Sequence, residues 1–84
     1  MANHTILVVE DEERVQQLVK LYLEKEGFTV DMAFDGKEAV KKARSGLPDL
    51  ILLDIMLPEM DGWEVCKELR KTMSTRIIML TAKW

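Results

Sequence analysis

The sequence predicts an α/β fold in which one domain, residues 1–84, is built on a doubly wound parallel sheet. Short apolar runs alternate with longer segments whose apolar residues recur at helical spacing. Two of these runs, 6–9 and 50–53, contain no polar residue, which is typical of strands covered on both faces of a parallel sheet. Both runs lead into a carboxylate, Glu10 or Asp54, at the edge where open α/β sheets bind ligands.

The first strand, 6–9, leads through an acidic segment into a helix. We expect Asp11 to cap this helix, because acidic residues suit the positive end of the helix dipole. Gly27 is typical of a residue that ends a helix. Six apolar residues in between form one broad stripe at helical spacing and are predicted to pack on the sheet. They are Val15, Leu18, Val19, Leu21, Tyr22 and Leu23.

The next two elements are a strand and a helix. Apolar and polar residues alternate over 28–33, which predicts a half-exposed strand at an edge of the sheet. The turn at Asp35 and Gly36 then starts a helix that runs to about Ser45 and that Gly46 ends.

The second half of the chain repeats this alternation. The strand 50–54 is followed by a loop that Pro58 and Gly62 impose before a third helix. A fourth strand is predicted at 76–80, because its residues after the first are all apolar. The inward face of the third helix is expected to hold Val65, Cys66, Leu69 and Met73.

The alternation of strands and helices implies a parallel sheet with right-handed crossovers. The strands that end at Glu10 and Asp54 are the two most apolar early strands, so we expect them to be neighbours in the middle of the sheet. Numbered along the chain, the predicted strand order is 2-1-3-4, with the strand 28–33 on the outside. This order brings the carboxylates of Glu10, Asp11 and Asp54 into one small pocket at the carboxyl ends of the strands.

Three carboxylates in one pocket raise one another's pKa unless a proton or a hard cation neutralises them. Oxygen ligands without a nearby His or Cys favour Mg²⁺ over zinc, and Mg²⁺ keeps positions open for phosphate oxygens. An aspartate in such a pocket can itself be the nucleophile that forms an acyl phosphate. Asp54 is our candidate for this role, although taken alone it could simply cap a loop. Thr81, at the end of the fourth strand, would lie beside the pocket and could hydrogen-bond a phosphoryl oxygen.

Three motifs in this order resemble the receiver domain of two-component response regulators. They are Val-Glu-Asp-Glu at 9–12, the segment 49–62 that ends in Leu-Pro-Glu-Met-Asp-Gly, and Ile-Met-Leu-Thr-Ala at 78–82. The resemblance covers the whole chain and implies a flavodoxin-like fold. It also implies that Asp54 accepts a phosphoryl group, in a Mg²⁺-dependent step, from a sensor histidine kinase.

The same resemblance implies a role for each residue of the pocket. Asp11 and Asp54 would ligate Mg²⁺ directly together with the backbone carbonyl of Met56, and Glu10 would act through a water molecule. Thr81 would be the switch hydroxyl whose movement toward the phosphoryl group biases a two-state rearrangement. The protein would then be a phosphoacceptor and not an enzyme, although it could assist its own phosphorylation and dephosphorylation.

The chain departs from the family pattern after the fourth strand. Family members continue with a helix, a fifth strand that ends in Lys-Pro and a last helix, so their phosphate-binding lysine and switch aromatic have no counterpart here. Lys83 does not match that lysine's position. Because the strand 76–80 is apolar on both faces, we expect self-association through this strand or by exchange of elements.

Charge and cysteine content exclude several classes of function. The chain carries 12 basic and 15 acidic residues, a net charge of -3, and no basic cluster, which argues against direct contact with nucleic acid. Cys66 is the single cysteine, so an internal disulfide is excluded. The apolar runs are too short to cross a bilayer, and no signal peptide is evident. We therefore expect a cytoplasmic protein with no membrane partner.

Two other functions stay open at this point. One is a structural module, a non-signalling receiver fragment of natural or engineered origin that self-associates. The other is a Mg²⁺-dependent phosphohydrolase, which is the weaker alternative because no second aspartate stands two residues after Asp54.

Overall fold

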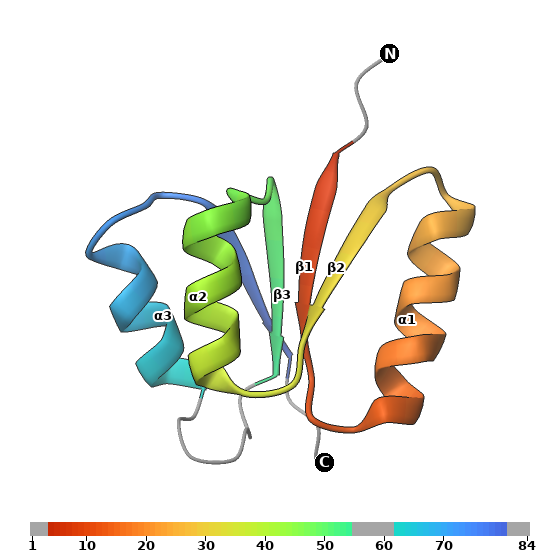
Figure 1. The fold of residues 1–84 in the computed structure, drawn as a ribbon, viewed down its shortest axis with the longest axis horizontal. Coiled ribbons are helices and arrows are strands. Elements are labelled where there is room, and N and C mark those ends of the chain that lie inside the picture. Colours follow the sequence, from red (N-terminus) through yellow and green to blue (C-terminus); the bar gives the residue numbers. More distant parts are fainter. Residues whose placement is uncertain (1–3, 55–61, 81–84) are drawn as a thin grey trace.

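Strands and helices alternate along the chain, as Figure 1 shows. The computed structural model describes residues 4–54 and 62–80. Its elements are β1 (Thr5–Val9), α1 (Glu13–Lys25), β2 (Thr29–Ala33), α2 (Gly36–Gly46), β3 (Leu50–Asp54), α3 (Gly62–Arg70) and β4 (Arg76–Leu80). Each element lies close to where the periodicity of the sequence predicts it. Met73 is an exception, because α3 ends at Arg70 and Met73 packs against the core from the segment that follows the helix.

The four strands form one parallel sheet in the order β2-β1-β3-β4, which confirms the predicted order. β1 pairs with both β2 and β3, so that Val8 lies between Met32 and Leu52. β2 is an edge strand, and the exposed Thr29 and Asp31 alternate with residues that are more buried, as predicted. The carboxyl ends of β1 and β3 therefore lie side by side.

One face of the sheet holds the main core. The residues of β1 and β3 that point to this face pack with side chains from α2 and α3, which lie beside each other in Figure 1. The buried residues of this core are Leu7, Val9, Ala33, Ala39, Ala43, Ile51, Leu53, Val65 and Leu69. Cys66 packs against the core and is partly buried, so its predicted place on the inward face of α3 is confirmed.

α1 buries only part of the apolar stripe that the sequence predicts, because Val15, Val19 and Leu23 are half-buried and the other three residues are exposed. Leu18, Leu21 and Tyr22 are 67–68% exposed, and the one fully buried residue of the helix is Gln16. The predicted stripe is wider than the contact, because α1 packs mainly against β1 and β2 among the described elements (Figure 1) and one narrow arc of the helix suffices to cover them. That arc runs through Gln16 and the half-buried Val19.

The helix ends follow local chemistry that the sequence indicates only in part. The carboxylate of Asp35 caps α2 by accepting a hydrogen bond of 2.8 Å from the backbone N–H of Glu38, and the helix begins at the turn that the sequence predicts. Gly27 follows α1 with φ 97°, a conformation that suits a residue without Cβ. The expectation that Asp11 caps α1 is wrong, because Glu12 occupies that position without a side-chain cap bond.

The second face of the sheet is thinly covered over β3 and β4. Ile51 and Leu53 are fully buried on the α2–α3 side, whereas Leu52 on the other side is only half-buried. On β4, Ile78 and Leu80 are 48% and 47% exposed. Within residues 4–54 and 62–80, no strand pairs with the outer edge of β4. None of the helices described is long and apolar enough to span a membrane.

Candidate functional site

Three carboxylates meet at the carboxyl ends of β1 and β3. Glu10 and Asp11 directly follow β1, and Asp54 is the last residue of β3. One oxygen from each side chain lies within 4.8 Å of the other two. Asp54 is 3% exposed, Glu10 is half-buried and Asp11 is exposed, so the cluster opens toward solvent above a buried aspartate. We call these three residues the acid cluster.

The structure therefore brings together three of the five residues that the sequence singled out. Thr81, the predicted switch hydroxyl, and Met56, whose carbonyl is a predicted metal ligand, both lie outside the described residues. Lys83 lies outside them as well. The carboxylate of Asp11 belongs to the acid cluster, and Asp11 lies one residue before the N-cap of α1.

Backbone hydrogen bonds hold Glu10 at the end of its strand. Its N–H donates to the carbonyl of Ala33 at 3.0 Å, so the pairing of β1 with β2 continues one residue past β1. Its own carboxylate Oε2 accepts a hydrogen bond of 3.1 Å from the N–H of Glu12, which turns the side chain back over the start of the loop. The residues on both sides of Asp11 are thus held by hydrogen bonds.

The side chain of Gln16 also contacts this region, which the periodicity of the sequence does not predict. Its Nε2 lies 2.9 Å from the carbonyl oxygen of Val8, 3.2 Å from that of Glu10 and 2.7 Å from that of Ala33. The available signal was a polar residue three positions before Val19 on the inward face of a helix.

Burial raises the pKa of Glu10 to about 7. The hydrogen bond from the N–H of Glu12 opposes this shift, while the charge of Asp54 and hydrogen bonds with Asp11 and Asp54 add to it. Near neutral pH the acid cluster therefore carries a proton on Glu10 for part of the time. A cation that binds the cluster would displace that proton.

The donor set fits a hard divalent cation. All three groups are carboxylates, and no His or Cys belongs to the cluster. Oxygens that bind one Mg²⁺ directly lie about 2.1 Å from the ion and hence at most about 4.2 Å apart. The carboxylate oxygens of the acid cluster lie within 4.8 Å of one another, so a small movement would allow them to bind one ion. Among residues 4–54 and 62–80, this is the one group of three or more such side chains with that spacing.

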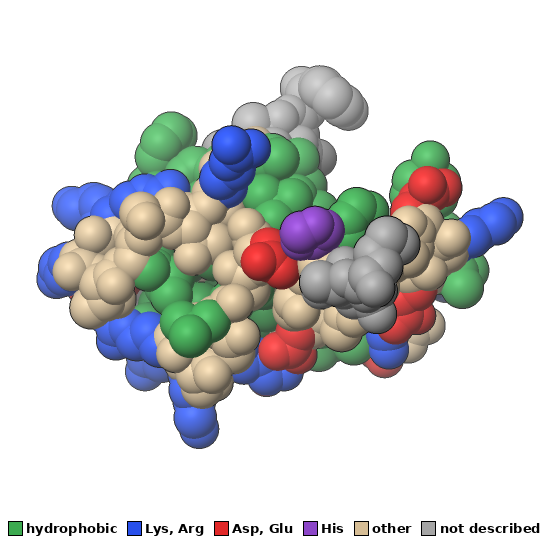
Figure 2. Space-filling view, turned by 90° about the horizontal axis from the view of Figure 1, so that it is seen from above, with side chains coloured by type: hydrophobic (Ala, Val, Ile, Leu, Met, Phe, Trp, Pro, Cys, Tyr) green, Lys and Arg blue, Asp and Glu red, His purple; other side chains and the backbone are tan. Residues whose placement is uncertain are grey.

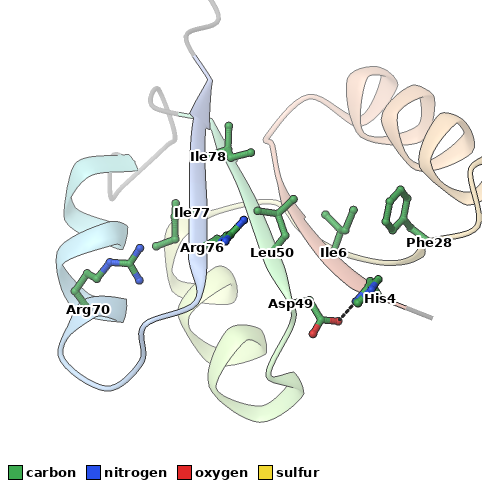
Figure 3. Close-up of a pocket in the computed structure, with 9 residues that line it drawn as sticks. All are labelled: His4, Ile6, Phe28, Asp49, Leu50, Arg70, Arg76, Ile77 and Ile78. Carbon is green, nitrogen blue, oxygen red and sulfur yellow. Dashed lines mark ion pairs between the residues drawn. The ribbon is translucent and has the colours of Figure 1, made fainter. Parts of the chain in front are cut away.

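A groove of about 630 Å³ lies at the amino ends of the strands, opposite the acid cluster. Figure 3 shows Leu50 and Ile78 facing it, with Arg76 beside them and the His4–Asp49 ion pair at its lower end. Figure 2 looks onto this end of the molecule, where hydrophobic side chains are exposed and Lys and Arg side chains gather on the side of α2 and α3. The carboxylate of Asp49 is held by the N–H of Thr5 at 2.8 Å. The groove is thus separate from the acid cluster.

Comparisons with known proteins agree with this geometry. The family model described as response regulator receiver domain matches residues 6–84. The transcriptional regulatory protein ResD of Bacillus subtilis is 51% identical over 78 residues, which are 93% of this chain and 32% of ResD. The alkaline phosphatase synthesis transcriptional regulatory protein PhoP of the same species is 54% identical over 82 residues, which are 96% of this chain and 34% of PhoP. The chain thus spans about a third of the length of these relatives.

Solved structures of receiver domains have the same fold. The receiver domain of the Francisella response regulator 1452 gives a TM-score of 0.91 at 37% identity, over 95% of this chain and 67% of that one. The Thermotoga maritima response regulator TrrA, solved in complex with Mg²⁺-BeF, gives a TM-score of 0.90 at 46% identity, over 95% of this chain and 70% of that one. The predicted fold class is confirmed. The chain belongs to the response regulator receiver domain family.

Proposed function

We propose that this chain is a receiver module in which Asp54 takes a phosphoryl group from the phosphohistidine of a sensor histidine kinase, with Mg²⁺ bound in the acid cluster. The observation that carries the proposal is the meeting of Glu10, Asp11 and Asp54 within 4.8 Å at the carboxyl ends of β1 and β3. Membership of the receiver family supports the phosphoacceptor role. The kinase and the metal ion are parts of the proposal.

The carboxylate of Asp54 is the nucleophile in this proposal. One of its oxygens attacks phosphorus, the P–O bond forms, and the P–N bond of the phosphohistidine breaks with its electron pair left on the imidazole. Bound Mg²⁺ would supply positive charge next to the transferred phosphoryl oxygens. The burial of Asp54, which is 3% exposed, would limit the access of water to the acyl phosphate once it has formed.

Each remaining residue has a supporting role. Asp11 and Asp54 would ligate the ion directly, and Glu10 would reach it through water, since the carboxylate of Glu10 already accepts a hydrogen bond from the N–H of Glu12. Thr81 and the carbonyl of Met56 keep the roles that the family resemblance implies. The chain would act as a phosphoacceptor that is used once per signal, and not as an enzyme that turns over.

Incubation with Mg²⁺ and acetyl phosphate tests the proposal. We expect intact-mass spectrometry to detect a gain of one phosphoryl group that is stable in acid and labile in base. Asp54→Asn should abolish the adduct because the amide is not a nucleophile of this kind. Asp31→Asn is the matched control, because this exposed aspartate lies on β2 and pairs with Lys42. An adduct that persists in Asp54→Asn, or phosphate released over many turnovers with no adduct detected, would contradict the proposal.

A self-associating structural module is a second candidate function. The observation that favours it is the exposure of Ile78 and Leu80, 48% and 47%, on a strand whose outer edge is unpaired among the described residues. The two functions are compatible, because β4 offers this edge while the acid cluster lies beyond β1 and β3. ResD and PhoP are transcriptional regulatory proteins by name. This chain matches about a third of the length of these two proteins, and for this third we propose no contact with nucleic acid.

A further inference from the structure

Gln16 is a polar side chain in a place where an apolar one is expected. It is 0% exposed and is the one buried residue of α1, while Leu18 and Tyr22 of the same helix face solvent. Burying an amide costs free energy unless hydrogen bonds replace those it makes with water. The contacts of Gln16 should therefore reveal why this residue is buried in place of an apolar one.

The side-chain amide of Gln16 gathers three backbone carbonyls from two strands. Its Nε2 contacts the carbonyl oxygens of Val8 and Glu10, at the end of β1, and that of Ala33, at the end of β2. The carbonyl of Ala33 also accepts the N–H of Glu10. Gln16 thus ties α1 to the point where the chain leaves the sheet and enters the acid cluster.

These contacts fit positioning better than packing. The Oε1 atom of Gln16 is buried and has no hydrogen-bond partner among the described residues, so the side chain carries an unsatisfied acceptor that an apolar residue would avoid. Three acceptors also converge on a nitrogen that has two hydrogens. A residue that only filled space would need neither feature.

We propose that Gln16 is a positioning residue that sets the affinity of the acid cluster for Mg²⁺ by fixing the backbone of Glu10. Glu10 is the link, because Gln16 holds its carbonyl, Ala33 holds its N–H and Glu12 holds its carboxylate. Asp11 is the next residue along the chain, so fixing the backbone of Glu10 also fixes the position of Asp11. The inference rests on the proposed function in one respect, namely that Mg²⁺ occupies the cluster.

The variant Gln16→Met tests this proposal, since the side chain of Met has a similar length but no N–H donor. We expect its Kd for Mg²⁺, measured by isothermal titration calorimetry, to rise roughly 10-fold or more, as is common when a residue that orients metal ligands is lost. Gln17→Met is the matched control, because Gln17 is exposed and makes a single side-chain bond of 3.4 Å to Glu13. The Kd of the Gln17→Met variant for Mg²⁺ should not change.

A second control separates positioning from general stability. Val65→Ala removes part of the core on the α2–α3 side, so it should lower the free energy of unfolding and leave the Kd for Mg²⁺ unchanged. If Val65→Ala weakens Mg²⁺ binding as much as Gln16→Met does, the proposal is wrong. It is equally wrong if Gln16→Met binds Mg²⁺ like the unsubstituted chain. Should Gln16→Met fail to fold, Gln16→Asn, which keeps the amide but shortens its reach, should still weaken binding.

Hydrogen exchange without metal keeps this inference distinct from the proposed function. We expect Gln16→Met to speed exchange of the amides of Glu10 and Glu12, and Gln17→Met to leave them unchanged. If the unsubstituted chain binds no Mg²⁺, the proposed metal site fails, yet faster exchange would still support the positioning of Glu10 by Gln16. Unchanged exchange at both amides would overturn it.

Discussion

At the scale of single residues, Glu10 couples the acid cluster to pH. Its pKa of about 7 in the folded chain lies above the ordinary value of 4.5 because the side chain is partly buried and close to Asp54. Protons and metal ions therefore compete for the same carboxylates. We expect the affinity for Mg²⁺ to fall as the pH is lowered below 7, and Glu10→Gln to remove most of this dependence, both measured by calorimetric titration.

The same shift predicts the pH dependence of stability without metal. A raised pKa means that the folded chain holds the Glu10 proton more tightly than the unfolded chain does. The stabilising contribution of Glu10 to the free energy of unfolding is then fully present below pH 4.5 and is lost as the pH rises through about 7. Urea unfolding in EDTA should show this loss in the difference between the unsubstituted chain and Glu10→Gln. An identical pH profile for both chains would contradict the prediction.

At the scale of elements, the two helix N-termini offer a matched comparison. Asp35 caps α2 with a hydrogen bond of 2.8 Å to the N–H of Glu38, whereas Glu12 at the N-cap of α1 makes no such bond. We expect Asp35→Ala to lower the free energy of unfolding by about 1 kcal/mol, because one N–H of the first turn loses its partner. Glu12→Ala should cost much less. Urea denaturation followed by circular dichroism measures both, and equal losses would contradict the assignment.

The elements also show where sequence periodicity is informative. It located all seven elements, because burial on a sheet imposes a period of two or 3.6 on the apolar residues. It was only partly right on α1, since a broad stripe does not reveal which arc of a helix touches the sheet. Tyr22 faces solvent and Gln16 does not, because the arc of α1 that packs against β1 and β2 includes Gln16.

At the scale of the whole molecule, the exposed side of β4 predicts self-association. Pairing of two copies through β4 would cover Ile78 and pair the edge of the strand that is unpaired within the described part of the chain. We expect sedimentation velocity to show association that increases with concentration and that Ile78→Lys weakens. Leu18→Lys is the control, because Leu18 is 68% exposed on α1, away from β4. A chain that stays monomeric at high concentration would show that the prediction is wrong.

The acid cluster could be predicted from the sequence because it follows from topology. Once β1 and β3 are neighbours in a parallel sheet, residues that directly follow or end these strands must meet, so Glu10 and Asp54 could be placed together. The role of Gln16 could not be predicted in this way. It depends on carbonyls of Val8 and Ala33, which belong to different strands and converge only in the folded chain.

The acid cluster joins positions that are far apart along the chain. Glu10 and Asp54 are brought together by the crossover through α1, β2 and α2, so an unfolded chain offers no comparable site. An ion that binds the native state alone shifts the folding equilibrium by mass action, and a hundredfold excess over its Kd adds roughly 2.7 kcal/mol. Chelators should accordingly lower the melting temperature of this chain. Bound Mg²⁺ would thus stabilise the folded state even in the absence of phosphoryl transfer.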